Sequence, residues 1–151
     1  MDGREIRAGQ INVQLRAGQS RRWLTLDLAA ELKLHGRDEL YLRIYLDAAG
    51  QRLSEETVFM APPRFLSLPR AACRVKVERV TPTVVRLRFA SPVYQHRLMF
   101  ELPGLPHKMF ANYFDVYPNE PRVIRVEFDR PSTNKQIKTA LQVRSLVDTY
   151  D

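Results

Sequence analysis

Apolar and polar residues alternate along most of this chain, in short runs separated by turn residues. In its first part the alternation covers residues 11–15, 24–28 and 40–46, with an apolar side chain at every second position. A period of two is the spacing of a half-buried β-strand, whose successive side chains point to opposite faces. No segment sustains the 3.6-residue spacing of a helix, so the pattern predicts an all-β protein.

The second part of the chain keeps this rhythm. Apolar residues alternate with charged ones in the runs 74–77, 85–89 and 124–128, and further apolar faces are expected from Leu98, Phe100 and Leu102 and from Leu141, Val143 and Leu146. Turns are predicted between them at Thr81-Pro82, Ser91-Pro92, Pro103-Gly104, Pro118-Asn119 and Arg130-Pro131. Short strands at this spacing favour an antiparallel, immunoglobulin-like β-sandwich.

A proline-rich stretch at residues 61–69 predicts a boundary between two domains. Its three prolines remove backbone donors and favour extended polyproline geometry, as in a stiff linker. Charge also changes there: residues 1–63 hold nine Lys/Arg and nine Asp/Glu, whereas residues 64–151 hold fifteen and eight, which places the whole net charge of +7 in the second part. We therefore expect a short β domain over 1–63 and a complete C-terminal immunoglobulin-like sandwich over 64–151.

The first domain offers about four strands, fewer than the seven of an immunoglobulin-type sandwich. Residues 47–50 predict a hairpin turn that returns through residues 57–60, and residues 29–34 fit either a short helix or a loop. The domain is thus either a small independent sheet or the later part of a truncated sandwich. In the second case an apolar face stays uncovered, and a homo-oligomer through residues 1–63 is expected. The side chains expected on that face are Ile11, Val13, Leu15, Leu24, Leu26, Leu42, Ile44 and Leu46.

The residue types of common active sites do not occur here in recognisable patterns. A glycosidase needs two carboxylates across a cleft, and no Asp/Glu pair stands out. The histidines at 35, 96 and 107 are far apart and form no metal-ligand spacing. No G-x-S-x-G elbow or phosphate-binding loop is present. We therefore predict no catalytic residue, metal or cofactor for this chain.

The single cysteine, Cys73, allows no internal disulfide and is expected to be a buried, inert thiol. The N-terminus lacks the apolar core of a signal peptide, and no run approaches the roughly 20 apolar residues of a membrane helix. No membrane partner is expected, and the compartment is not encoded in these features.

The excess positive charge lies on the polar half of the predicted strands. Arg74, Lys76, Arg86, Arg88 and Arg125 each alternate with apolar residues. A solvated sheet face that resists edge-to-edge pairing is the favoured interpretation. A nucleic acid or other polyanion, and an acidic surface on a neighbouring domain, are the less favoured alternatives.

Aromatic residues are densest at Phe110, Tyr113, Phe114 and Tyr117. Such rings bind sugars in some proteins, but in a strand they more often fill a core or an interface, which is the expectation here. The only tryptophan, Trp23, is likewise expected to pack rather than to serve as a sugar platform.

Residues 107–121, HKMFANYFDVYPNEP, resemble the F-S-D-N-Y-F-D-L-x-P-G-E-P segment in the C-terminal immunoglobulin-like domain of β-mannosidases of glycoside hydrolase family 2. Residues 59–69 are similar to that family's F-x-x-P-K-x-L-x-L-P connector, and 145–150 are similar to its C-terminal ending. The direct matches in the first segment are Asn112, Tyr113, Phe114, Asp115, Pro118, Glu120 and Pro121.

Two departures from the family segment matter. The family's F-S-D is Met109-Phe110-Ala111 here, so a hydroxyl and a carboxylate are lost, and the family's glycine is Asn119, which retains access to positive φ. The resemblance makes residues 1–63 the later part of the preceding domain. The parent's catalytic barrel, roughly 250 residues long, does not fit in this chain, so its catalytic glutamates are not carried over.

Three functions remain open at this point. The resemblance implies a non-catalytic accessory region that braces the catalytic barrel or the assembly of a parent glycosidase. The alternatives are a carbohydrate-binding module that uses Tyr113, Phe114 or Tyr117, and a basic polyanion-binding domain. Candidate interface or ligand residues are Asn112, Tyr113, Phe114, Asp115 and Tyr117.

Overall fold

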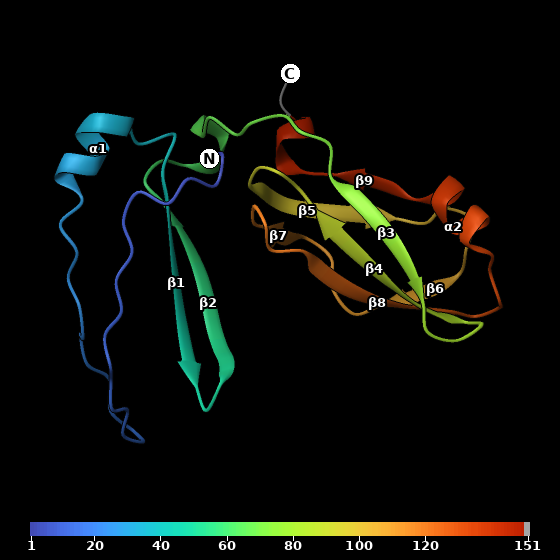
Figure 1. Ribbon diagram of the computed structural model, residues 1–151, viewed down its shortest axis with the longest axis horizontal. Helices are drawn as coiled ribbons and strands as arrows, with labels where there is room; N and C mark the ends of the chain where they lie inside the picture. Colours follow the sequence, from blue (N-terminus) through green and yellow to red (C-terminus); the bar gives the residue numbers. More distant parts are fainter. Residues whose placement is uncertain (150–151) are drawn as a thin grey trace. The chain divides into compact units, whose positions relative to one another are not determined.

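The computed structural model describes residues 1–149, and Tyr150, where the C-terminal resemblance ends, lies outside them. The chain forms two compact units (Figure 1). Residues 4–66 are called the hairpin unit, and residues 1–3 with 67–151 the sandwich unit. All strand pairs are antiparallel. The all-β, immunoglobulin-like class predicted from the sequence is confirmed.

The sandwich unit contains two sheets. One has the strand order β3-β4-β8-β6 and the other β7-β5-β9. The strands are β3 (Arg74–Arg79), β4 (Val84–Ala90), β5 (Gln95–Glu101), β6 (His107–Met109), β7 (Phe114–Val116), β8 (Arg122–Phe128) and β9 (Gln142–Arg144).

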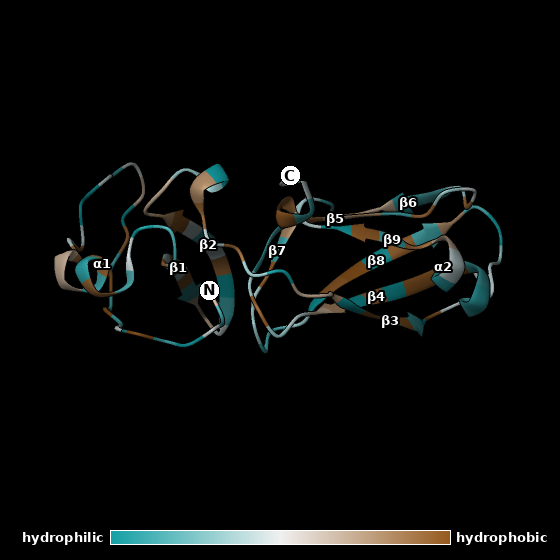
Figure 2. Ribbon diagram, turned by 90° about the horizontal axis from the view of Figure 1, so that it is seen from above, coloured by the Kyte–Doolittle hydropathy of each residue, from teal (hydrophilic) through white to brown (hydrophobic). Residues whose placement is uncertain are grey.

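Alternating side chains sort onto the two faces of these strands. On β4, Val85, Leu87 and Phe89 are fully buried, while Arg86 and Arg88 between them are exposed. Figure 2 shows this as alternating hydrophobic and hydrophilic bands along β4. The expected inward positions of the other central strands are buried as well. They are Leu98, Phe100, Leu102, Ile124, Val126 and Phe128.

A short helix, α2 (Asn134–Ala140), closes one side of the sandwich unit and was not predicted. It buries Ile137 in the core. Thr133 caps its first turn, with Thr133 Oγ1 accepting a hydrogen bond from the Gln136 amide and the Gln136 side chain accepting one from Thr133 N. This reciprocal capping box, T-x-x-Q, is the sequence signal that could have revealed the helix.

The hairpin unit contains α1 (Ala29–His35), β1 (Tyr41–Ala48), β2 (Gln51–Phe59) and a 3₁₀ turn at Pro63–Phe65. Strands β1 and β2 form a two-stranded sheet. Ala49 and Gly50 connect them with φ of 50° and 74°, the double positive φ of a type I′ turn. The predicted hairpin is therefore confirmed, and of the two readings of residues 29–34 the helix is correct.

Three details of the sequence prediction are wrong. Residues 11–15 and 24–28 are not strands, because a strand needs a neighbour and none of the described segments pairs with them. Leu146 belongs to a 3₁₀ turn (Leu146–Thr149) rather than to the last strand. The linker is only partly polyproline: Pro62 has φ −56° and ψ 144°, but the chain then tightens into the 3₁₀ turn.

Candidate functional site

The candidate residues 112–117 lie at one edge of the three-stranded sheet, where β7 pairs with β5. Gln95 lies opposite Val116, and Leu98 lies opposite Phe114. Pairing with a buried strand gives alternate residues of the segment different environments, so each candidate side chain has its own role.

Asn112 completes the backbone hydrogen bonding of β5. Its Oδ1 accepts from Phe100 N at 3.0 Å, and its Nδ2 donates to Phe100 O at 3.1 Å. One amide side chain thus satisfies both main-chain groups of a buried strand residue, as a neighbouring strand would. The role of Asn112 in this structure is architectural.

Tyr113 and Phe114 point to opposite environments. Tyr113 has a backbone φ of 59°, and 64 % of its surface is exposed to solvent. Phe114 is buried, with its ring 5.1 Å from that of Phe89 in an edge-to-face arrangement. Phe114 therefore belongs to the core and cannot face a sugar, which corrects its place among the candidate ligands.

Asp115 lies at the centre of a largely buried polar network. Its Oδ2 accepts a 2.6 Å hydrogen bond from the Tyr94 hydroxyl, and its Oδ1 accepts a 2.9 Å bond from Arg97 N. His96 Nδ1 lies 3.1 Å from Oδ1 and 3.0 Å from the Tyr94 oxygen. Burial works to raise the pKa of Asp115, but the hydrogen bonds from His96, Arg97 N and Tyr94 outweigh it and lower the pKa.

Tyr94 and His96 were not among the candidate interface or ligand residues predicted from the sequence. Both are buried, at 1 % and 8 % exposure. Tyr94 directly precedes β5 and His96 lies within it, and their rings are 6.0 Å apart. A buried tyrosine and a buried histidine need hydrogen-bond partners for their polar atoms. The presence of both residues next to a predicted strand was the sequence signal for a polar network.

Tyr117 and Asn119 belong to the turn that follows β7. The Tyr117 ring lies 5.4 Å from that of Tyr94, so it is held against the network. Glu120 N donates to Tyr117 O at 3.2 Å across Pro118 and Asn119. Asn119 has φ 63°, as type II geometry requires at this position. The expected positive φ of Asn119 is confirmed.

Cys73 is half-buried against the core of the sandwich unit. Burial raises the pKa of its thiol to about 11. The thiolate is the reactive form, so this thiol stays protonated and unreactive at neutral pH.

The outer face of the four-stranded sheet carries the four arginines and the lysine singled out from the sequence. Lys76 lies opposite Arg88 in the β3–β4 ladder, and Glu78 contacts both, at 3.4 Å and 3.3 Å. Arg125 contacts Glu127 at 2.5 Å. These ion pairs partly neutralise the face and fit the interpretation of a solvated sheet surface.

Trp23 does not sit in a core. It is 37 % exposed, and the Arg21 guanidinium stacks over its ring at 4.5 Å. Together with polar side chains such as Asn12 and Gln14 it lines a shallow hollow of about 640 Å³. The ring is therefore partly covered and partly exposed, and its most clearly described contact is with Arg21.

Within residues 1–149, no three His, Cys, Asp or Glu side chains gather where a metal ion could be held. No helix in that range has the length and apolar character needed to cross a membrane.

These features define an immunoglobulin-like, antiparallel β protein whose candidate residues serve mainly to hold strands together. Comparison with protein families identifies the family of this domain. The chain belongs to the mannosidase Ig-fold domain family, whose model matches residues 71–149. Residues 1–64 match a second model, described as a mannosidase Ig/CBM-like domain. The resemblance to the immunoglobulin-like region of a β-mannosidase-type protein is thereby confirmed.

A solved structure shares the fold. The crystal structure of β-D-mannosidase from Dictyoglomus thermophilum matches with a TM-score of 0.62 and 21 % sequence identity. The match covers 73 % of this chain but 13 % of that enzyme. No curated protein matches the chain.

Proposed function

We propose that the chain is a non-catalytic accessory region of a larger β-mannosidase-type glycoside hydrolase and that it braces the rest of that protein. The observation that carries this proposal is the coverage by the two family models. Together they take up residues 1–64 and 71–149, which leaves no stretch long enough for a catalytic barrel.

The candidate site supports the same conclusion. A glycosidase acid needs a raised pKa so that it holds a proton near neutral pH. Asp115 is the opposite, because its hydrogen bonds hold it ionised. Asn112 is bonded to β5, and Asp115 is bonded to β5 and to Tyr94 directly before it, so both side chains hold neighbouring segments of the domain together.

The first experiment measures hydrolysis of aryl β-mannoside and aryl β-galactoside by the purified chain. We expect no turnover above a heat-killed control. Turnover that co-purifies with the chain, with contaminating enzyme excluded, would overturn the proposal.

The second experiment tests bracing itself. The DNA flanking the reading frame is expected to encode a glycoside hydrolase barrel, which is then expressed with and without residues 1–151. Removal should lower the temperature at which the barrel loses activity, and a Leu98→Ala change, which weakens the sandwich core, should lower it in part. A barrel equally stable in all three forms, or flanking DNA without one, would contradict bracing.

Carbohydrate binding through Tyr113, Phe114 and Tyr117 gains little from the structure. Phe114 is in the core and Tyr117 is held against Tyr94, so Tyr113 is left as the single exposed ring of the three. Sugar sites usually combine a ring with convergent polar groups, and the polar side chains on either side of Tyr113 in the sequence that were candidates, Asn112 and Asp115, are bonded to β5.

A further inference from the structure

Strand β1 has one edge with no strand beside it. Among residues 1–149 it pairs with β2 alone, so the β1–β2 hairpin is a two-stranded sheet (Figure 1). Such a hairpin is marginally stable in water without a third strand or a packed layer. The eight residues of β1, YLRIYLDA, include no proline or lysine, the residues that usually protect an edge from pairing.

The two faces of this hairpin differ in character. Leu42, Ile44 and Leu46 share one face with Val58, Glu56 and Ser54 of β2, so the apolar side chains of this face come mainly from β1. Ile44 is 50 % exposed and Val58 is 38 % exposed, whereas Leu42 and Leu46 are half-buried, so this face is only partly covered within the chain. Large apolar side chains at such exposure mark an interaction surface.

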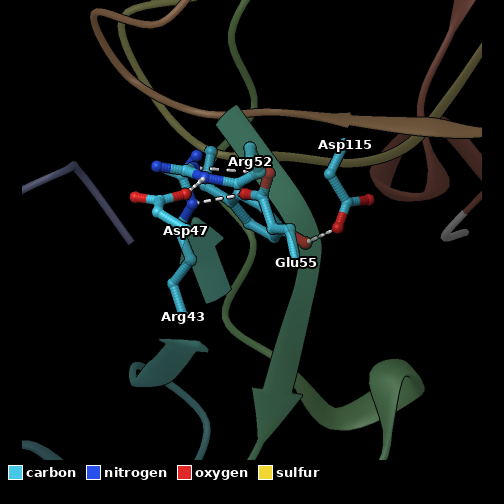
Figure 3. Close-up of polar contacts among 6 residues, drawn as sticks. Arg43, Asp47, Arg52, Glu55 and Asp115 are labelled. Atoms are coloured by element: carbon cyan, nitrogen blue, oxygen red, sulfur yellow. Dashed lines mark hydrogen bonds and ion pairs between the residues drawn. The ribbon is translucent and has the colours of Figure 1, made fainter. Parts of the chain in front are cut away.

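The other face of the hairpin is polar and ordered by ion pairs (Figure 3). Arg43 contacts Glu55 at 2.5 Å, and Arg52 contacts Asp47 at 2.8 Å. The Arg52 guanidinium also lies over the Tyr45 ring at 3.7 Å. Arg43, Tyr45 and Asp47 therefore stand in line along β1, with a cation and an anion at equal distances on either side of the tyrosine.

The charges of β1 match those of a second, antiparallel copy of β1, because the cation of one copy then lies opposite the anion of the other. In a symmetric antiparallel pair, one residue lies opposite its own copy and the others pair at equal distances on either side. Centring the pair on Tyr45 sets Arg43 opposite Asp47 twice and Ile44 opposite Leu46 twice. Centring it on Arg43 or on Asp47 sets like charges opposite each other, which is destabilising.

The outer edge of β2 is less suited than that of β1 to pairing with a second copy. The β1–β2 register shifts between Leu46 and Asp47, which leaves Leu53 as an extra residue in β2. A bulge bends its strand and interrupts the ladder. A pair centred on Glu55 or on Glu56 would also bring two carboxylates together.

We propose that two copies of this chain associate through β1, edge to edge and antiparallel, about a two-fold axis at Tyr45. The product is a four-stranded sheet with the order β2-β1-β1-β2. One face of this sheet brings Leu42, Ile44 and Leu46 of the two adjacent β1 strands together at its centre, with Val58, Glu56 and Ser54 on the outer β2 strands. The self-association concerns this chain alone, so it stands whether or not the bracing function holds.

Light scattering on the full chain gives the first measure. We expect the mass of a dimer at 200 µM and dissociation on dilution. A monomer at every concentration up to 200 µM would overturn the proposal.

Disulfide trapping tests the axis directly. In a Cys73→Ser background, a Tyr45→Cys variant places each thiol opposite its own copy, whereas the matched control Thr57→Cys sits on β2. In the proposed sheet the two β2 strands lie three strand spacings apart, roughly 14 Å, too far for a disulfide. Mild oxidation should link the Tyr45→Cys variant at least tenfold faster. Equal rates in the two variants would overturn the register.

An Ile44→Lys change adds the protection that β1 lacks. It should raise the dimer dissociation constant at least tenfold while the thermal unfolding of the sandwich unit stays unchanged, which shows that the chain is still folded. A dimer that survives this change with its affinity intact would place the interface elsewhere and overturn the proposal.

Discussion

The two units of this protein use the same sequence pattern to different ends. In the sandwich unit, alternation produces two sheets whose inner faces fill one core. In the hairpin unit, Leu66 alone is buried among the described residues, although its runs of leucine and isoleucine are as regular. Alternation therefore specifies which side chains share a face, and a core forms only where a second layer covers that face.

The difference has an energetic meaning. Burying a large apolar side chain contributes about 1.5–3 kcal/mol to the free energy of folding, and a side chain that stays in water contributes little of this. The hairpin unit has such exposed side chains from Ile6 to Phe65. It therefore depends on association, with a second copy or with the remainder of a larger protein, for stability that the sandwich unit supplies by itself.

The sharpest test of this comparison uses one substitution in both units. Leu98 is fully buried and Leu24 is 52 % exposed, yet both occupy the apolar positions of alternating runs. Leu98→Ala should lower the free energy of unfolding by about 3–5 kcal/mol because it leaves a cavity. Leu24→Ala should lower it by less than about 1 kcal/mol. Urea unfolding followed by circular dichroism measures both, and equal losses would contradict the account.

The Asp115 network should make the stability of the sandwich unit depend on pH. Because the folded-state pKa of Asp115 lies below its ordinary value of 3.8, its stabilisation is complete above that value and is lost as pH falls through the lower folded value. Asp115→Asn should cost about 2 kcal/mol at pH 7 and flatten the stability curve below pH 4.

A matched control for that variant is Glu78→Gln. Glu78 also has a lowered pKa, first through its hydrogen bond with Lys76, but it lies on the solvent face. Its change should leave stability at pH 7 nearly unaltered. Thermal melts of the two variants are compared between pH 2.5 and 7. Equal losses of stability in the two variants would mean that the Asp115 network contributes no more than a surface ion pair.

A smaller effect is expected at the turn after β7. Asn119 has φ 63°, which a β-branched residue resists. Asn119→Val should destabilise the sandwich unit by about 1–2 kcal/mol, and Asn119→Gly should be neutral or mildly stabilising. If the valine variant melts at the temperature of the parent, the turn does not hold this conformation in solution.

The smallest predicted effect concerns the cap of α2. Thr133→Ala removes the oxygen that accepts from Gln136 N and should cost about 1 kcal/mol. Ser132→Ala is the matched control, since the Ser132 hydroxyl makes only a 3.4 Å contact with Arg130 O. A larger loss from the serine variant in urea unfolding would argue against the capping box.

Sequence reasoning worked best where local pattern and tertiary packing agree. Val85, Leu87 and Phe89 could be assigned to a core because their strand is central and one of its faces is sealed. Residues 11–15 carry the same pattern but form no strand, because the pattern does not reveal whether a neighbouring strand is present.

The candidate site was predictable as a segment but not in its chemistry. The resemblance pointed to Asn112 and Asp115. Their partners Phe100 and Tyr94, however, lie 12 and 21 residues away, and only the fold brings them together. Helix α2 escaped notice because seven residues are too few to establish a 3.6-residue period.

The central claim, that packing stability is confined to the sandwich unit, is tested most directly by amide hydrogen exchange followed by mass spectrometry. The measurement is made on the full chain at low micromolar concentration, where association is minimal. We expect peptides from β4, β5 and β8 to exchange slowly, near the global unfolding limit, and peptides from residues 4–40 to exchange almost at once. Slow exchange throughout residues 4–40, comparable to that of β4, would contradict the account.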